Sequence, residues 1–347
     1  MKWYWAALCS MLLIGGCNSP SIHPHHLFWG VALDGYPIEE DRIKAVAFET
    51  GIMPRIVTFF LQWPQSPGIA QFPEQTLTAI WSVGAIPCLT WEPMSIENEK
   101  ETMVSHTAIT GGAYDAFLKN FAQAARAWGR PIIFRFAHEM NSQRYHWGTT
   151  EANYGPNSPA IYQDIFRYIV SIFRQESADN VLWAFCPNAE SVPNISTDPK
   201  AGWNQAAAYY PGDEFVDLLG MDGYNWGSTQ TLKTHGWQSN WKSFESIFST
   251  LHMELRAISS TKPVIVFETA STDQGGNKGQ WIQEAFQIID KWKLNGVVWF
   301  EVKKELDWRL RSGTSSDHLA WLRSRLSPAQ VWANGLVSDR RSRANGK

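Results

Sequence analysis

The stretch "PIIFRFAHEMNSQRYHWG", residues 131–148, decides the fold. It begins as an apolar segment suited to a β-strand. It then brings a carboxylate, two imidazoles and two further aromatic rings together within ten residues. In a (β/α)₈ barrel the working residues lie at the C-terminal ends of the strands and in the loops that follow. The stretch therefore indicates one strand of such a barrel.

The rest of the chain repeats this alternation of strand and helix. Strands are predicted at 28–33, 55–60, 85–91, 131–137, 180–186, 216–221, 263–268 and 296–301. Helical patterns fall at 38–51, 72–84, 112–129, 158–176, 240–258, 277–293 and 316–325. Only the connection from 180–186 to 216–221 lacks a clear helix. Eight strands with intervening helices predict a single (β/α)₈ TIM barrel of the α/β class, with a doubly wound sheet as the alternative.

The bulk composition is that of a globular protein. The chain has 347 residues, 44% of them hydrophobic and 18% charged, and a formal net charge of -3. That charge gives no reason to expect a nucleic acid partner. The 19 tryptophans are unusual, because an indole ring suits the face of a sugar as well as a protein core. We expect a monomer with neither cofactor nor metal.

The N-terminus predicts export and lipidation. Residues 1–16 read as a signal peptide with an apolar run too short to span a bilayer. Its end, "LLIGGC", resembles the lipobox of bacterial lipoproteins, which implies lipidation of Cys17. An ordinary secretory signal with a chance cysteine is the alternative. We expect a tether at 17–26, the barrel at 27–326 and a tail at 327–347 with a disordered basic end, on a protein anchored to the periplasmic or cell-surface side of a bacterial membrane.

Two cysteines remain in the predicted barrel. Cys88 and Cys186 each lie in an apolar, strand-like run without a second ligand nearby. We expect two buried free thiols, not a disulfide or a metal site.

Carboxylates and aromatics gather at the predicted strand ends. Two carboxylates across an aromatic cleft are the apparatus of glycoside hydrolysis. Glu139 and Glu268 end the fourth and seventh strands, which face each other, and Glu92 with Glu301 is a competing pair that spacing does not exclude.

Other chemistries fit less well. "HEMNS" begins like the zinc motif H-E-x-x-H, but its last position is Ser142, so the second histidine is missing. The chain has no G-x-S-x-G nucleophile elbow and no glycine-rich phosphate loop. A structural alternative remains, in which Glu139 is merely ion-paired with Arg135 or Arg144.

An ordered set of motifs resembles glycoside hydrolase family 26. These are "FRFAHEMN" with "YHWG", "VLWAFCPN", "YYPGDEFVDLLGMDGYNWG", "KPVIVFETAS" and "VVWFEVKKELDWRL". Each is weak alone, but together they cover most of the chain after residue 26. The resemblance implies a retaining (β/α)₈ enzyme that acts on a β-linked polysaccharide.

The same resemblance implies roles for individual residues. Glu139 would be the general acid/base and Glu268 the nucleophile. His138 would lie around the scissile bond, Tyr224 would orient the nucleophile, and Trp299 would form an apolar floor. Further candidates for sugar contacts, with core packing as the alternative for each, are Trp91, Asn141, Tyr145, Trp147, Asp222 and Trp226.

The substrate stays open between two polysaccharides. "WEP" at 91–93 and "DGYNWG" at 222–227 favour an endo-acting β-1,3-1,4-glucanase over an endo-β-1,4-mannanase. The polysaccharide could come from outside or be made by the cell itself. A non-catalytic, lipid-anchored carbohydrate-binding protein is the alternative from another class.

Overall fold

The computed structural model describes residues 27–68, 71–150, 154–323, 333–338 and 340. Eight parallel strands close into a barrel in the order β1-β10-β9-β8-β7-β6-β3-β2. The barrel strands are β1 Phe28–Ala32, β2 Ile56–Gln62, β3 Ile86–Glu92, β6 Ile132–Phe136, β7 Val181–Phe185, β8 Leu218–Asn225, β9 Val264–Ser271 and β10 Gly296–Phe300. All eight match strands predicted from the sequence, which confirms the TIM barrel.

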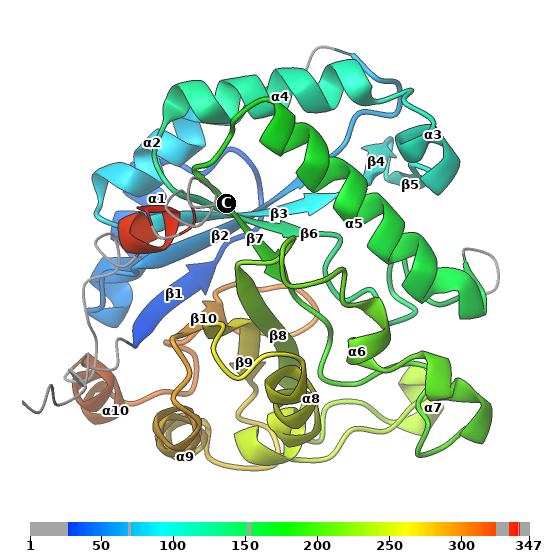
Figure 1. Ribbon diagram of the computed structural model, residues 1–347. Helices are drawn as coiled ribbons and strands as arrows, with labels where there is room; N and C mark the ends of the chain where they lie inside the picture. The colour runs from blue at the N-terminus through cyan, green and yellow to red at the C-terminus, as the bar shows by residue number, and fades with distance from the viewer. Residues whose placement is uncertain (1–26, 69–70, 151–153, 324–332, 339, 341–347) are drawn as a thin grey trace, which may run out of the picture.

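The helices form an outer layer around the barrel (Figure 1). The seven predicted helices are α1 Glu40–Thr50, α2 Glu74–Ser82, α4 Asp115–Trp128, α5 Ser158–Gln175, α8 Phe244–Ile258, α9 Lys278–Trp292 and α10 Ser316–Arg323. Only short elements, η2 Pro199–Trp203 and α6 Ala206–Tyr209, connect β7 to β8, as the sequence indicated. Each of the longer helices buries an apolar face against the strands.

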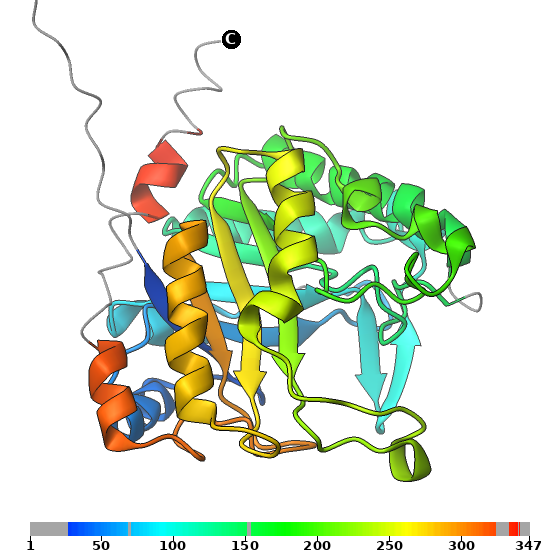
Figure 2. The same ribbon diagram turned by 90° about the horizontal axis from the view of Figure 1, so that it is seen from below.

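Several short elements were not predicted. They are the hairpin β4 Met94–Glu97 and β5 Lys100–Met103, and the helices α3 His106–Thr110, η1 Gly155–Asn157 and α7 Leu232–His235. The hairpin and the loop with α7 project from the end of the barrel toward which the strands point (Figure 2). They extend the rim on which the site is built.

The core has two parts, because successive side chains of a strand point to opposite faces. Inward-facing residues such as Ile133, Leu182 and Val298 fill the barrel. Outward-facing residues such as Phe134 and Trp183 pack against the helices. Cys88 and Cys186 belong to the inner part and are free and buried, as expected.

Part of the predicted C-terminal tail packs against the barrel. Residues 333–338 are helical, and Ala333 and Val337 are buried against the interior cluster of the barrel. Arg340 donates to the carbonyl oxygens of Asp179 and Val181 and to the carboxylate of Asp217. This segment lies at the end of the barrel where the strands begin (Figure 2). Hydrophobic contacts that the sequence pattern did not reveal therefore order part of the segment predicted as a tail.

The predicted signal peptide, the predicted tether and Cys17 lie outside the described residues. None of the helices in the described ranges is both long and apolar enough to cross a membrane.

Candidate active site

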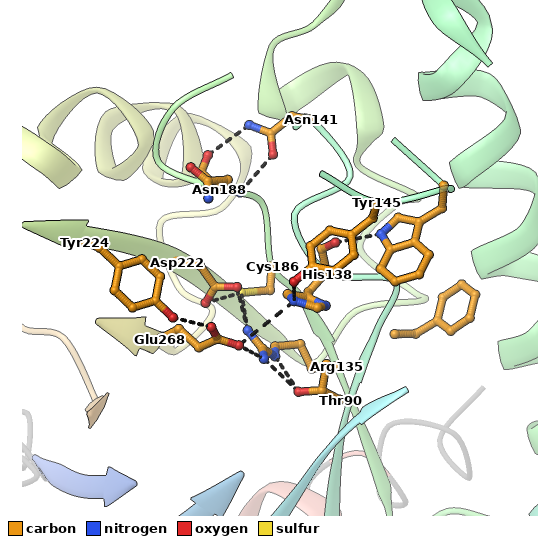
Figure 3. A network of polar contacts seen from close by, with 12 residues as sticks. Thr90, Arg135, His138, Asn141, Tyr145, Cys186, Asn188, Asp222, Tyr224 and Glu268 are labelled. Carbon is orange, nitrogen blue, oxygen red and sulfur yellow. Dashed lines mark hydrogen bonds and ion pairs between the residues drawn. The ribbon is translucent and has the colours of Figure 1, made fainter. Parts of the chain in front are cut away.

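A buried arginine lies at the centre of the site. Arg135 on β6 points into the barrel and is fully buried. One terminal nitrogen is 2.5 Å from Asp222 Oδ2 on β8, and the other donates to Glu268 Oε1 on β9 (Figure 3). Its Nε also donates to Thr90 Oγ1, at 3.0 Å. Burial lowers the pKa of Arg135, but the two carboxylates together outweigh burial and raise it, so the guanidinium stays charged.

A β-bulge brings Glu268 to this centre. The register between β8 and β9 shifts so that Met221 pairs with Val266 but Asp222 pairs with Glu268, which leaves Phe267 as the extra residue. Phe267 packs in the barrel interior, and Glu268 reaches Arg135 inside the same barrel. In a regular strand two consecutive side chains would point to opposite faces, and a bulge re-aims one of them.

Glu139 is held by a strained turn at the end of β6. Ala137 has φ 44° and Glu139 has φ 54°, left-handed values that cost a non-glycine residue about 1–3 kcal/mol each. The Glu139 amide donates to the carbonyl of Cys186 at 2.8 Å, which fixes the turn against β7. Burial, followed by the negative charge of Glu268, raises the pKa of Glu139 to about 7, although a hydrogen bond from Asn188 opposes the rise.

Tyr224 completes the surroundings of Glu268. Its hydroxyl is 2.5 Å from Glu268 Oε2 and donates to it, which is the contact that the family resemblance implied. Burial and then the charge of Glu268 raise the pKa of Tyr224 well above its usual value, so the hydroxyl keeps its proton. Each carboxylate oxygen of Glu268 thus has its own donor, Arg135 for one and Tyr224 for the other.

His138 connects the aromatic residues of this loop to the carboxylate. Its Nε2 lies 2.9 Å from the hydroxyl of Tyr145 and 4.0 Å from Glu268 Oε1. Burial, followed by the positive charge of Arg135, lowers its pKa well below the usual value, so the imidazole is neutral. Tyr145 stacks on Trp147 with ring centroids 4.6 Å apart, and Trp147 donates to the His138 carbonyl.

The unpredicted hairpin supports the same loop from outside. Glu101 on β5 pairs with Arg144 at 3.2 Å and with His146 at 3.3 Å. Arg144 also lies over the Tyr145 ring, 5.1 Å from its centroid. Arg135 pairs with Asp222 and Glu268, and Arg144 pairs with Glu101. Neither arginine forms an ion pair with Glu139, so the alternative in which Glu139 is merely paired with one of them is wrong.

Two predicted sugar contacts prove to be internal. Asp222 is fully buried beneath Arg135 and has no surface for a ligand. Asn141 is 1% exposed and uses its amide to hold the backbone of Asn188 and the hydroxyl of Ser191. Asp222 therefore balances charge, and Asn141 positions the loop that carries the Glu139 partner Asn188.

Two tryptophans were assigned to the wrong face of their strands. Trp91 on β3 packs outward among Trp63, Phe121 and Phe134, in the layer between barrel and helices. Trp299 on β10 likewise stacks on Trp29 and meets Trp281 of α9. Both are buried away from Arg135, so the strand alternation that places their neighbours inside the barrel excludes them from the site.

The competing carboxylate pair is separated for the same reason. Glu92 follows Trp91 and faces the barrel mouth, where Gln62 donates a hydrogen bond to it. The charge of Arg135 lowers its pKa, and the charge of Glu268 raises it. Glu301 follows Phe300 and lies with Lys278, accepting a hydrogen bond from the Leu310 amide at 2.8 Å. Burial raises the pKa of both carboxyl groups to about 7. After burial, Glu268 is the largest influence on the pKa of Glu139, whereas it is a minor influence on that of Glu92, so the structure favours Glu139 with Glu268.

An aromatic wall lies beside Tyr224 and was only partly predicted. Trp308 packs 5.3 Å from Tyr224 and 4.9 Å from Trp226, and Phe300 is 5.6 Å from Tyr224, centroid to centroid. Three hydrogen bonds hold the backbone at 308–310. Trp299 donates to the Trp308 carbonyl and Lys278 donates to the Arg309 carbonyl. Glu301 accepts from the Leu310 amide. Trp299 thus supports the wall from behind.

His138, Asp222 and Glu268 each offer an atom within 4.8 Å of the others, close enough to share a cation. Arg135 already donates to both carboxylates, so a positive charge occupies this arrangement without a metal. Among the described residues, Arg135 therefore accounts for the close approach of His138, Asp222 and Glu268.

Together these residues define a class of protein: a (β/α)₈ barrel with two carboxyl groups at the rim, one with a raised pKa and one held by two donors, beside an aromatic wall. The sequence comparison agrees with that class. The model of Glycosyl hydrolase family 26 matches residues 47–253, more than half of the chain, and the chain belongs to that family.

Curated relatives and solved structures are consistent with this assignment. Endoglucanase H of Acetivibrio thermocellus is 37% identical over 67% of this chain and 24% of its own length. A mannan endo-1,4-beta-mannosidase of Bacillus subtilis is 25% identical over 57% of each chain. The chain thus spans only about a quarter to a half of these relatives. The fold resembles that of a mannanase of Bacillus subtilis, with a TM-score of 0.60, 16% identity and coverage of 88% of this chain and 87% of the other. It also resembles that of a beta-mannanase from Bacteroides ovatus, with a TM-score of 0.59, 17% identity and coverage of 88% of this chain and 90% of the other.

The central ion pairs predict a specific pattern of stability. Arg135→Met leaves two buried carboxylates without their cation, so we expect the free energy of unfolding at pH 7 to fall by about 3–5 kcal/mol. The deficit should shrink as the pH falls, because carboxyl groups deprived of the cation take up protons more readily. Urea denaturation at pH 5 and pH 7 measures both effects.

The matched control is Arg135→Met combined with Asp222→Asn. Removing a charge together with its partner costs less than removing the partner alone. The double variant should therefore be more stable than the single one, and equal stability would show that Asp222 is not paired as described.

Proposed function

We propose that the protein is a retaining endo-acting β-glycanase, with Glu139 as acid/base and Glu268 as nucleophile. The observation that carries the proposal is the contrast between the two carboxyl groups. Glu139 has a pKa raised to about 7 and can hold a proton near neutrality, while Glu268 is held by the Arg135 guanidinium and the Tyr224 hydroxyl. A pair of carboxyl groups in different environments is what acid and nucleophile roles require.

In the first step, a carboxylate oxygen of Glu268 attacks the anomeric carbon and forms a glycosyl ester. The bond from that carbon to the glycosidic oxygen breaks, and the proton of Glu139 passes to the departing oxygen. Esterification removes the negative charge of Glu268, which helped to raise the pKa of Glu139. Glu139 is then a carboxylate that can take a proton from a water molecule. The oxygen of that water bonds to the anomeric carbon, and the bond from this carbon to the Glu268 oxygen breaks, which releases the Glu268 carboxylate.

The neighbouring residues support both steps. Arg135 and Tyr224 fix the orientation of Glu268 and favour the return of its charge when the ester is hydrolysed. Asn188 donates to Glu139 and is in turn held by Asn141. Neutral His138 lies between Tyr145 and Glu268 without adding a charge to the cleft.

For the substrate we propose a β-1,3-1,4-glucan. The relative named as an endoglucanase is 37% identical to this chain, against 25% for the mannosidase of Bacillus subtilis. Another mannosidase, from Bifidobacterium adolescentis, is 33% identical over 36% of the chain, and this supports a β-1,4-mannan as the second candidate. The polysaccharide could be external or self-made.

A panel of lichenan, mannan, xylan and cellulose tests the proposal. We expect reducing sugar to be released fastest from lichenan by the wild type, and not measurably by Glu268→Ala. Fastest release from mannan would replace the glucanase by the mannanase. Binding without release on every polymer would favour the carbohydrate-binding alternative.

The raised pKa of Glu139 predicts the alkaline limb of the pH profile. Because the acid must be protonated, kcat/KM should fall as the pH rises through about 7. Glu139→Gln should lose about 10²–10⁴-fold in rate on polysaccharide and lose this limb on an aryl glycoside, whose leaving group needs no proton.

Rescue by azide distinguishes the acid/base from the nucleophile. Azide should rescue Glu139→Ala and give a glycosyl azide of retained configuration, because it attacks the glycosyl ester. It should rescue Glu268→Ala with inverted configuration, because it then attacks the substrate directly. Proton NMR distinguishes the products, and the opposite assignment would exchange the roles of the two residues.

We also propose export and anchoring through a lipid on Cys17, with the barrel acting as a monomer. The support is the resemblance of "LLIGGC" to a lipobox. A clickable palmitate analogue should label the wild type in a bacterial host but not Cys17→Ser, with Cys9→Ser as the matched control. Equal labelling of wild type and Cys17→Ser would end the lipidation proposal.

A further inference from the structure

A large aromatic residue is exposed next to the site. Trp237 is 44% exposed and lies in the loop between β8 and α8, which projects from the rim of the barrel (Figure 2). An isolated surface tryptophan needs no explanation. Trp237 is not isolated, however, because it contacts the aromatic wall of the cleft.

The rings form a continuous line outward from the nucleophile. Tyr224 donates to Glu268, and its ring centroid lies 6.5 Å from that of Trp226. Trp226 in turn meets Trp237 edge to face at 5.6 Å and Trp308 at 4.9 Å. Trp226 is partly buried, and Trp237 is the most exposed of the four rings. The aromatic contacts around Tyr224 therefore continue to an exposed ring on the loop.

The loop that carries Trp237 is firmly closed at its base. The Asn225 side chain accepts from the amides of Gly227 and Lys242, so it joins the two ends of the loop. Gln230 and Ser239 are paired through the Gln230 amide to Ser239 Oγ at 3.0 Å and the Ser239 amide to the Gln230 carbonyl at 3.2 Å.

The residue before Trp237 fixes its direction. Gly236 ends α7 with φ 76°, a left-handed value that favours glycine, and its amide donates to the Leu232 carbonyl. Together with the closed base and the edge-to-face contact with Trp226, this restricts where the Trp237 ring can lie. A fixed exposed ring binds a ligand at a lower entropic cost than a mobile one.

We propose that Trp237, with the edge of Trp226, forms a distal subsite that stacks the pyranose rings of a β-linked polysaccharide as it leaves the cleft. This inference rests on the proposed function, because the occupant is a further part of the same substrate. A polysaccharide is the occupant that fits an exposed indole in contact with rings that reach the proposed nucleophile, because sugar rings pack against flat apolar faces. The subsite contributes to the binding of long chains and plays no part in the chemistry.

The test compares long and short substrates. Trp237→Ala should lower kcat/KM on the preferred polysaccharide about fivefold, mainly through KM, and should leave kcat/KM on a short aryl glycoside unchanged. Trp237→Phe should recover part of the loss. Leu232→Ala, which removes a 67% exposed apolar side chain from the same loop, is the matched control and should match the wild type.

Affinity electrophoresis in gels containing the same polysaccharides gives a readout that needs no turnover. Trp237→Ala should migrate faster than the wild type in the polymer gel and equally in a blank gel. If the wild type is retarded through Trp237 but releases no sugar, the proposed function fails and the subsite stands. If Trp237→Ala equals the wild type in both assays, or loses activity equally on long and short substrates, the distal subsite is overturned.

Discussion

The site depends on one buried cation inside the barrel. Taking Arg135 out of water is costly unless its hydrogen-bonding groups find partners, and Thr90, Asp222 and Glu268 supply them from three other strands. The arginine thereby fixes β3, β6, β8 and β9 relative to one another at the end where the chemistry is proposed. Its charge also lowers the pKa of Glu139 and Glu92, against the burial that raises both to about 7.

The strain at the end of β6 has a place in this arrangement. Left-handed backbone at Ala137 and Glu139 persists only where surrounding contacts hold it. Those contacts are the Glu139 amide on the Cys186 carbonyl, and the packing of Tyr145 and Trp147 around His138. The turn places Glu139, the proposed proton donor, where the charges of Arg135 and Glu268 both act on its pKa.

Much of the fold could be predicted because a (β/α)₈ barrel repeats one local pattern eight times. The site was harder, because it depends on which face of a strand a side chain occupies. At β10, an uninterrupted alternation turns Trp299 and Glu301 outward and Phe300 inward, yet the sequence alone does not show which register holds. At β9, the bulge after Val266 reverses the rule for Glu268, and no residue type in "VIVFET" announces it. Arg135 could have been found, since a charged residue within the apolar run "PIIFRFA" must be paired if it is buried. The positions of Trp237, of residues 333–338 and of Arg340 depend on contacts between distant parts of the chain.

The start of the described chain and the candidate active site lie at opposite ends of the barrel, and this arrangement affects how the protein would face a membrane. The described chain enters at Leu27, beside the start of β1 and at the end closed by Ala333 and Val337, whereas Glu139 and Glu268 lie at the other end. If Cys17 carries the proposed lipid, the end of the barrel with Ala333 and Val337 would face the membrane, and the end with Glu139 and Glu268 would face away from it. Such an orientation favours capture of polymer chains arriving from the surroundings over those still lying against the bilayer.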